Sequence, residues 1–382
     1  MTRMDAPMLG SFSNVLDRVR ALLPNVQEAA DESEQAGRIT SRTLLALRDA
    51  GTFRMCVPRS LDGGELPPAM VLDVVETLAT VDASTAWSAM IGATTAVVSG
   101  YLSEDTAKEI YGPSTTVTVG PFAPLGRARR DGDGYRLSGR WPYVSMCRDA
   151  SWIVGGGLDD NSRRTLFLFP ARNAHIHETW QVMGLRGTGS HDIEVREEFI
   201  PAARAVPFGF EQPVNDAPLY RFPVLGLLAA AISSTAIGAA RGAVNDLIEL
   251  AGAKTPTYAI RRLQERPLVQ LQVGQAEAEL RAARAFLREA VAEAWDQAQD
   301  GTVGVTQRAT LRLAAAQATA TSARVVDLMY AAGGGTSNYL HSPLQRRFRD
   351  VHAATQHVMV SSATIELAGR VLLGMRVDPD QL

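Results

Sequence analysis

The spacing of apolar residues changes twice along the 382-residue chain, and these changes limit the folds that it can adopt. Residues 11–111 are rich in alanine and repeat apolar side chains every three or four positions, which predicts helices. Residues 113–210 hold short β-branched and aromatic runs between turn residues, which predicts strands. Residues 222–376 return to the helical spacing.

This order predicts the α+β fold class. We expect an N-terminal helical domain (1–112), a middle antiparallel β domain (113–210) and a C-terminal bundle of long helices (211–382). Four runs in the middle zone have the composition of strands: 116–119, 135–138, 151–154 and 165–169. Two glycine-rich sequences, 131–134 and 155–157, are predicted to form turns between them.

Three segments of the last zone, 275–299, 305–332 and 343–373, carry helical patterns about twice the mean helix length. Ser342 and Gln345 predict a capping box at the start of the third, with Pro343 at its first position. Alanine on several faces favours a close-packed bundle, part of whose surface meets another subunit.

Composition excludes several classes of partner. A net charge of -3 and a pI near 6.1 give no reason to expect nucleic acid or an anionic membrane as a partner.

Residues 1–20 lack the apolar region of a secretory signal. The apolar stretch 222–242 contains Arg241 and several small polar residues, so it predicts a buried helix and not a membrane span. Two cysteines, Cys56 and Cys147, suit a reducing cytoplasm.

Common catalytic and nucleotide-binding motifs are absent: the sequence has no dinucleotide fingerprint, P-loop, zinc-protease motif or serine elbow. The Gly333-Gly334-Gly335 run follows a predicted helix, so it is either a helix C-cap or a close approach of backbone to a ligand. His175 and His177 share a strand face without a third ligand nearby, and no metal site is expected.

Two histidines lie on the last predicted helix. His352 and His357 are five positions apart, which places them about 140° apart around a helix. His357 lies roughly opposite the apolar stripe of Leu344, Val351 and Val358. It is therefore either a solvent-exposed histidine or, if that face meets the β domain, a residue in a ligand site between domains.

Arg346, Arg347 and Arg349 crowd the first turns of the same helix, where cations oppose the helix dipole. A negatively charged group must balance the charges of these three arginines. Buried carboxylates such as Asp350 or Asp327 are one explanation, and a cofactor phosphate is the other.

The order of the zones and several strings resemble the acyl-CoA dehydrogenase superfamily over nearly the whole chain. GRWPYVS (139–145) is similar to its β-domain segment, whose final hydroxyl, here Ser145, sits at the flavin N5. VMGLRGTGS (182–190) is similar to a loop of the same domain. YAIRRLQ (258–264) resembles a string whose arginine, here Arg262, reaches the flavin phosphate of a neighbouring subunit; Glu265-Arg266 follows it in place of the usual Phe-Gly.

One branch of the superfamily fits best. The dehydrogenases need a carboxylate base, and neither of its usual places, here 356–359 and 223–227, holds Glu or Asp. PLQRRFRDVHAATQH (343–357) closely resembles the signature of the flavin-dependent hydroxylases, which include phenol-type, aromatic-polyketide and amine-oxidising members. Thr94 stands where phenol hydroxylases often carry another histidine, which implies a different substrate orientation.

The resemblance implies the oxygenase component of a two-component monooxygenase. A separate reductase would supply reduced FMN or FAD, and dioxygen would form a flavin C4a-hydroperoxide that hydroxylates a small aromatic, polyketide or amine substrate. Ser145 would bind N5 and His357 would be the acid or base. The remaining implied cofactor contacts are Trp141 and Tyr143 at the ring, and Arg262, Gly334, Gly335 and Ser337 around ring and phosphate. A cytoplasmic homotetramer is expected.

Two alternatives remain open. The first is an FAD-dependent acyl-CoA dehydrogenase or desaturase, which would hold FAD tightly. The second is a scaffold that keeps the fold and has lost the cofactor, which would bind no flavin.

Overall fold

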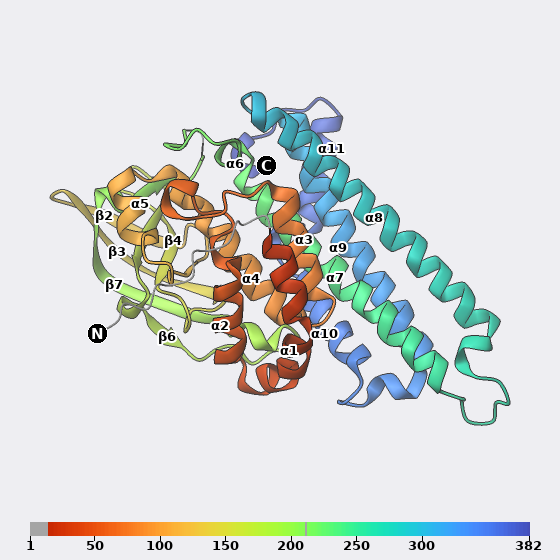
Figure 1. The fold of residues 1–382 in the computed structure, drawn as a ribbon. Coiled ribbons are helices and arrows are strands. Elements are labelled where there is room, and N and C mark those ends of the chain that lie inside the picture. Colours follow the sequence, from red (N-terminus) through yellow and green to blue (C-terminus); the bar gives the residue numbers. More distant parts are fainter. Residues whose placement is uncertain (1–13, 211) are drawn as a thin grey trace.

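The computed structural model describes residues 14–210 and 212–382. The first residues of the predicted N-terminal helical zone, 11–13, lie outside the described residues. Figure 1 shows a sheet on one side of the molecule, long helices on the other, and the N-terminal helices between them. This placement puts the N-terminal helices in contact with both of the other layers.

Five α-helices form the middle layer: α1 (Val15–Ala36), α2 (Ser41–Ala50), α3 (Pro68–Ala79), α4 (Ala83–Thr95) and α5 (Glu104–Tyr111). Helix α4 begins at Asp82, whose side chain accepts a hydrogen bond from the backbone N–H of Thr85. All of its residues are buried except Ile91, which is partly exposed. Buried on all sides, α4 provides a rigid support for any side chain that faces the sheet.

Eight strands form a single sheet: β1 (Thr118–Val119), β2 (Gly126–Asp131), β3 (Gly134–Val144), β4 (Trp152–Leu158), β5 (Arg164–Pro170), β6 (His175–His177), β7 (His191–Pro201) and β8 (Ala205–Pro207). The order is β6-β7-β3-β2-β4-β5-β8, and β1 pairs with β4. Most neighbours are antiparallel, as predicted, but β4 pairs in parallel with both β1 and β2. The sheet is therefore mixed.

One of the two predicted turns is confirmed, since residues 131–134 join β2 to β3. The other is wrong, because Gly155, Gly156 and Gly157 lie inside β4 and are buried. A Cβ at Gly156 would overlap the carbonyl oxygen of Phe122, and one at Gly155 would meet the ring of Trp141 at 3.2 Å. These glycines make room for close packing inside the sheet.

The C-terminal helices are α6 (Pro218–Arg221), α7 (Val224–Ala253), α8 (Pro267–Asp300), α9 (Val305–Gly333), α10 (Pro343–Thr355) and α11 (Ser362–Leu372). By length and composition α7 passes the test for a membrane span, but 83% of its most apolar window is buried inside the protein. This fits the predicted buried helix. The α-helices of the first zone thus end at Tyr111, and those of the last zone begin at Pro218. The division into three domains stays a prediction.

The helix predicted over 343–373 is not continuous. It stops at Thr355 and is followed by a short 3-10 helix, Val358–Val360, before α11 begins. His357 therefore lies beyond the end of α10, and the 140° argument about its face does not apply. Ser342 is the N-cap residue, but its side chain makes no capping bond, and Gln345 instead donates to the carbonyl of Leu340. The predicted capping box is therefore wrong.

Candidate active site

Ser145 lies just after β3, where the chain leaves the sheet towards α4. The Nε1 of Trp87 on α4 donates to its Oγ at 3.1 Å. The Oγ of Ser190 lies 2.8 Å from the same oxygen, and the Oγ1 of Thr188 lies 2.6 Å from that of Ser190. All three hydroxyl residues are less than 7% exposed, so the hydroxyls form a chain shielded from water.

Trp87 also connects Ser145 to His357. The rings of Trp87 and His357 meet edge to face with their centroids 5.8 Å apart. Residues 87, 145 and 357 come from α4, the end of β3 and the segment after α10, so the fold gathers them from all three layers. Of the residues predicted for the site, the structure thus brings Ser145 and His357 together around a shared indole.

The proton positions on His357 follow from its hydrogen bond. Its Nδ1 accepts the backbone N–H of Met359 at 3.2 Å and so caps the 3-10 helix. Burial, followed by the positive charge of Arg312, lowers the pKa of His357 to about 4. The imidazole is therefore neutral at pH 7, with its one hydrogen on Nε2. In this state His357 offers a donor at Nε2 and has no free lone pair.

Arg312 on α9 holds the segment that carries His357. It donates to the carbonyls of Gln381 at 3.0 Å and Met359 at 3.4 Å, and to the Oγ1 of Thr364 at 3.3 Å. It is only 4% exposed, and no carboxylate pairs with it in the described part of the chain. This buried cation adds to the effect of burial in making protonation of His357 unfavourable.

The Arg349-Asp350 pair of α10 fixes the loop before Ser190. The Oδ1 of Asp350 accepts the backbone N–H of Leu185 at 2.7 Å, and Arg349 donates to the carbonyl of Met183 at 2.6 Å. A Cβ at Gly184 would overlap the carbonyl oxygen of Arg349, so this loop lies directly on the helix. Burial, and then repulsion from Asp82, raise the pKa of Asp350 to about 7.

Carboxylates pair with all three arginines at the start of α10, as one of the two explanations predicted. They come from other helices, however, and not from Asp350 or Asp327. The ion pairs are Arg346–Asp31 (2.7 Å), Arg347–Asp246 (3.1 Å) and Arg349–Glu34 (2.6 Å). Asp327 instead pairs with His352 at 2.8 Å. No phosphate is needed to balance these cations.

The two aromatic residues predicted at the flavin ring lie in different surroundings. Tyr143 is 74% exposed beside Ser145 and has a φ of 63°. Trp141 is fully buried, and its Nε1 donates to the carbonyl of Gly156 at 2.7 Å. Trp141 therefore packs inside the β domain, and its expected place at the flavin ring stays a prediction. Tyr143 keeps an open ring face.

Backbone strain also occurs beside this hydroxyl chain, as it does at several other places among the described residues. Tyr143, Met146 and Leu185 all have positive φ values, between 52° and 63°. Each such residue costs on the order of 1 kcal/mol or more, and strain of this kind is concentrated at functional sites. Tyr143 is two residues before Ser145, and Met146 follows it directly. Leu185 provides the carbonyl that the hydroxyl of Thr188 binds.

The other predicted cofactor residues lie at the far end of the bundle. Arg262 belongs to the loop between α7 and α8 and donates to the carbonyl of Gly252. Gly334 and Gly335 are exposed after α9, and Lys254 ties the two segments together through the carbonyl of Gly333. Ser337 is fully buried and donates to the carbonyl of Tyr330, so its hydroxyl caps the helix end. Figure 1 places this end away from the sheet.

Three residues of the hydroxyl site were not predicted as functional: Trp87, Thr188 and Ser190. The last two belong to the VMGLRGTGS string, which could have pointed to them. Trp87 gave no such signal, because a helix buried on every side has no distinct face in its sequence pattern.

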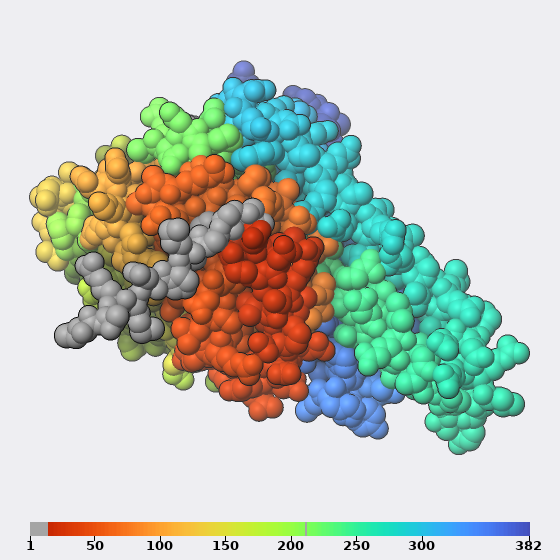
Figure 2. Space-filling view, in the orientation of Figure 1, coloured from red at the N-terminus to blue at the C-terminus, as the bar shows by residue number. Residues whose placement is uncertain are grey.

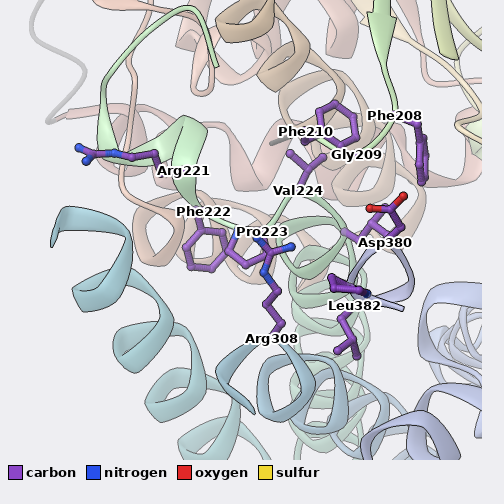
Figure 3. Close-up of a pocket in the computed structure, with 12 residues that line it drawn as sticks. Phe208, Gly209, Phe210, Arg221, Phe222, Pro223, Val224, Arg308, Asp380 and Leu382 are labelled. Atoms are coloured by element: carbon purple, nitrogen blue, oxygen red, sulfur yellow. The ribbon is translucent and has the colours of Figure 1, made fainter. Parts of the chain in front are cut away.

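The molecule also has a pocket where the end of the sheet segment meets α7, α9 and the C-terminal residues (Figure 3). Aromatic and cationic side chains line it, among them Phe208, Phe210, Phe222, Arg221 and Arg308. None of the residues predicted for the site lines this pocket. The pocket is linked to the Ser145–His357 site only through Arg312, which donates a hydrogen bond to the carbonyl of Gln381 next to the pocket.

The chain is similar to known proteins over most of its length. Residues 230–362 match the family model of the acyl-CoA dehydrogenase C-terminal domain. Indole-3-acetate monooxygenase of Pseudomonas putida is 32% identical over 95% of each chain. The oxygenase subunit of a flavin-dependent monooxygenase of Rhodococcus jostii, HsaA, is 30% identical over 90% of this chain and 93% of its own. The crystal structure of 3-HSA hydroxylase from a Rhodococcus species superposes with a TM-score of 0.92 at 26% identity, covering 97% of this chain and 99% of its own. The chain therefore belongs to the oxygenase components of flavin-dependent monooxygenases, a branch of the acyl-CoA dehydrogenase superfamily.

Proposed function

We propose that this chain hydroxylates a small aromatic substrate with reduced flavin from a separate reductase. The observation that carries the proposal is the meeting of Ser145 and His357 around Trp87. The names of two similar proteins, an indole-3-acetate monooxygenase and a flavin-dependent oxygenase subunit, support an aromatic substrate and a flavin. A cytoplasmic location is part of the proposal, in keeping with the two unpaired cysteines.

The residues present fit a flavin ring. The Oγ of Ser145 uses two of its three hydrogen-bonding positions on Trp87 and Ser190, and one position is left. The exposed ring of Tyr143 lies next to it, as a surface on which a flat heteroaromatic ring can stack. Among the described residues, no carboxylate is bonded to Ser145, Trp87 or His357, which disfavours the acyl-CoA dehydrogenase alternative because that reaction needs a carboxylate base.

Reduced flavin, when bound, activates dioxygen and supplies the reactive oxygen atom. Ser145 would hold N5. His357, neutral and hydrogenated at Nε2, would donate a hydrogen bond to the oxygen or the substrate; its Nδ1 is already occupied by Met359. This arrangement favours a hydrogen-bond donor over a proton acid or base. The buried hydroxyl chain keeps water from Ser145.

The deciding experiment compares two sources of electrons, with indole-3-acetate as the probe substrate. The purified chain should form hydroxylated product with photoreduced FMN or FAD and dioxygen, and none with NADH alone. The sequence holds no nicotinamide-binding motif, which is the reason for the second expectation. Mass spectrometry of the product would check both results. Turnover with NADH and no reductase would overturn the two-component assignment, and reduction of a dye by an acyl-CoA would favour the dehydrogenase.

We further propose a homotetramer in which Arg262 reaches the cofactor of a neighbouring subunit. Within one chain the 254–266 loop lies at the end of the long helices that points away from the sheet, and it protrudes from the body (Figure 2). Tyr258 and Ile260 in this loop are fully exposed, and Leu268 and Leu271 beyond it are more than 60% exposed. Apolar side chains exposed to this degree favour an interface.

Light scattering is expected to give the mass of four chains at micromolar concentration. Because the 254–266 loop supplies the exposed contacts, Ile260→Asp should lower the mass and weaken binding of reduced flavin together. Val214→Asp, at an exposed apolar side chain outside this loop, is the control. A stable wild-type monomer that binds flavin normally would contradict both the assembly and the role of Arg262.

A further inference from the structure

Arg312 differs from the other buried arginines of the described residues in having no negative charge beside it. Three arginines are buried there, Arg54, Arg312 and Arg347, with exposures of 4%, 4% and 7%. Arg347 pairs with Asp246 at 3.1 Å, and the charge of Asp62 favours the charged form of Arg54. Burial alone acts on Arg312 and lowers the pKa of its guanidinium to about 10. Arg312 is therefore still charged at pH 7, with no carboxylate to balance it.

The hydrogen bonds of Arg312 leave this charge in place. Its terminal nitrogens donate to the carbonyls of Gln381 and Met359 and to the hydroxyl of Thr364, and all three acceptors are neutral. Its Nε is also buried and has no acceptor among the described residues. A buried charge without a counter-charge destabilises a fold, so the fold's own stability does not account for this residue.

Met359 connects Arg312 to His357. Its carbonyl accepts a hydrogen bond from Arg312 at 3.4 Å, and its N–H donates to the Nδ1 of His357 at 3.2 Å. Arg312 is the one charged group among the described residues that shifts the pKa of His357. The field that opposes a positive charge on the imidazole favours a negative charge next to it. Since Nε2 carries the hydrogen of the ring, the group beside it must also be an acceptor.

We propose that the substrate carries a carboxylate, which accepts the Nε2 hydrogen of His357 in the field of Arg312. This inference rests on the proposed function and names its substrate class, a small aromatic acid. At pH 7 a carboxylate is ionised, whereas a phenol, with an ordinary pKa of about 10, is mostly neutral. A hydrogen bond to an ionised oxygen is stronger than one to a neutral oxygen. Arg312 thus determines specificity through its charge.

The test compares an acid with its uncharged amide. Indole-3-acetate and indole-3-acetamide have nearly the same shape, so the ratio of their affinities measures the preference for charge. Each is titrated by calorimetry into the anaerobic chain with reduced FMN or FAD present, and phenylacetate and phenylacetamide form a second pair. We expect the wild type to bind the acid about tenfold more tightly than the amide. Arg312→Gln should lower the affinity for the acid about tenfold and leave that for the amide unchanged.

Arg54→Gln is the matched control, because Arg54 is equally buried and binds the carbonyls of Pro113 and Tyr111 and none of the residues around His357. Its ratio of acid to amide affinity should equal that of the wild type. Arg312→Met, whose side chain also lacks the charge, is the second variant in case Arg312→Gln does not fold. Damage to the fold would weaken the acid and the amide together, which separates it from loss of the charge.

Three results would overturn the inference: wild-type affinities for acid and amide that are equal, no binding of either acid, or a preference for the acid that survives in the Arg312 variants. Weaker binding of reduced flavin in Arg312→Gln, with an unchanged ratio of acid to amide affinity, would assign the charge to the cofactor and overturn it as well. A wild-type chain that prefers the acid but hydroxylates neither ligand with reduced flavin would instead overturn the proposed function.

Discussion

Replacing His357 by asparagine is expected to lower hydroxylation a hundredfold or more while the fold and flavin binding remain. Removal of one positioned hydrogen-bond donor typically lowers the rate by a factor of this size. The neutral imidazole holds its hydrogen on Nε2 because Met359 occupies Nδ1 and because burial and Arg312 keep its pKa near 4. Single-turnover product formation with photoreduced flavin would measure the loss, and circular dichroism would confirm the fold.

His352→Asn is the matched control for this variant. His352 pairs with Asp327 and packs on Phe348, so it serves the contact between α9 and α10 and lies outside the Trp87 cluster. Its replacement should cost a packing contact and leave the rate near that of the wild type. If His352→Asn abolished turnover while His357→Asn remained active, the assignment of the catalytic histidine would be reversed. If His357 were merely a surface residue, its variant would change stability by no more than about 0.5 kcal/mol and leave the rate unchanged.

The second large effect is expected for Ser145→Ala, which should still bind reduced flavin but release hydrogen peroxide in place of product. One hydroxyl contributes only about 1 kcal/mol to binding, so affinity falls little. The same hydroxyl is held at a fixed position by Trp87 and Ser190, and its loss leaves N5 without that partner during the reaction with oxygen. We expect about a tenfold rise in the ratio of peroxide to product, measured with a peroxidase-coupled assay.

Ser138→Ala provides the comparison, because Ser138 lies on the same strand and bonds to Glu197 at the sheet surface. Its ratio of peroxide to product should equal the wild-type value. If Ser145→Ala were as well coupled as Ser138→Ala, another residue would have to stand at N5.

The three layers could be predicted from the sequence because apolar residues have a different spacing in the helical and strand segments. The helices before Tyr111, the strands between Thr118 and Pro207 and the long helices after Pro218 follow the expected order. Ser145 and His357 were proposed as site residues through strings that resemble a family, and not through periodicity. The local signals were weaker: a run of three glycines predicted a turn, whereas the indole of Trp141 uses that space inside the sheet.

The break after Thr355 was not predictable from local signals. The sequence from 355 to 361 contains neither proline nor glycine, and nothing in it marks the end of a helix. The break depends on tertiary contacts, since Arg312 from α9 holds the carbonyl of Met359 and His357 caps the turn that follows. Trp87 was missed for a similar reason, because its partners lie 58 and 270 positions away in the sequence.

Trp87 donates to Ser145 and packs its ring edge to face against His357, so under the proposed function a single side chain would serve both the oxygen-handling and the substrate-facing parts of the site. This has a consequence for directed evolution. A library that varied position 87 to admit a new substrate would also change how much oxygen is wasted, because the N–H that fixes Ser145 would be lost with the indole. Substrate range and the share of oxygen that ends in product are therefore linked at this position. Selection for one would alter the other.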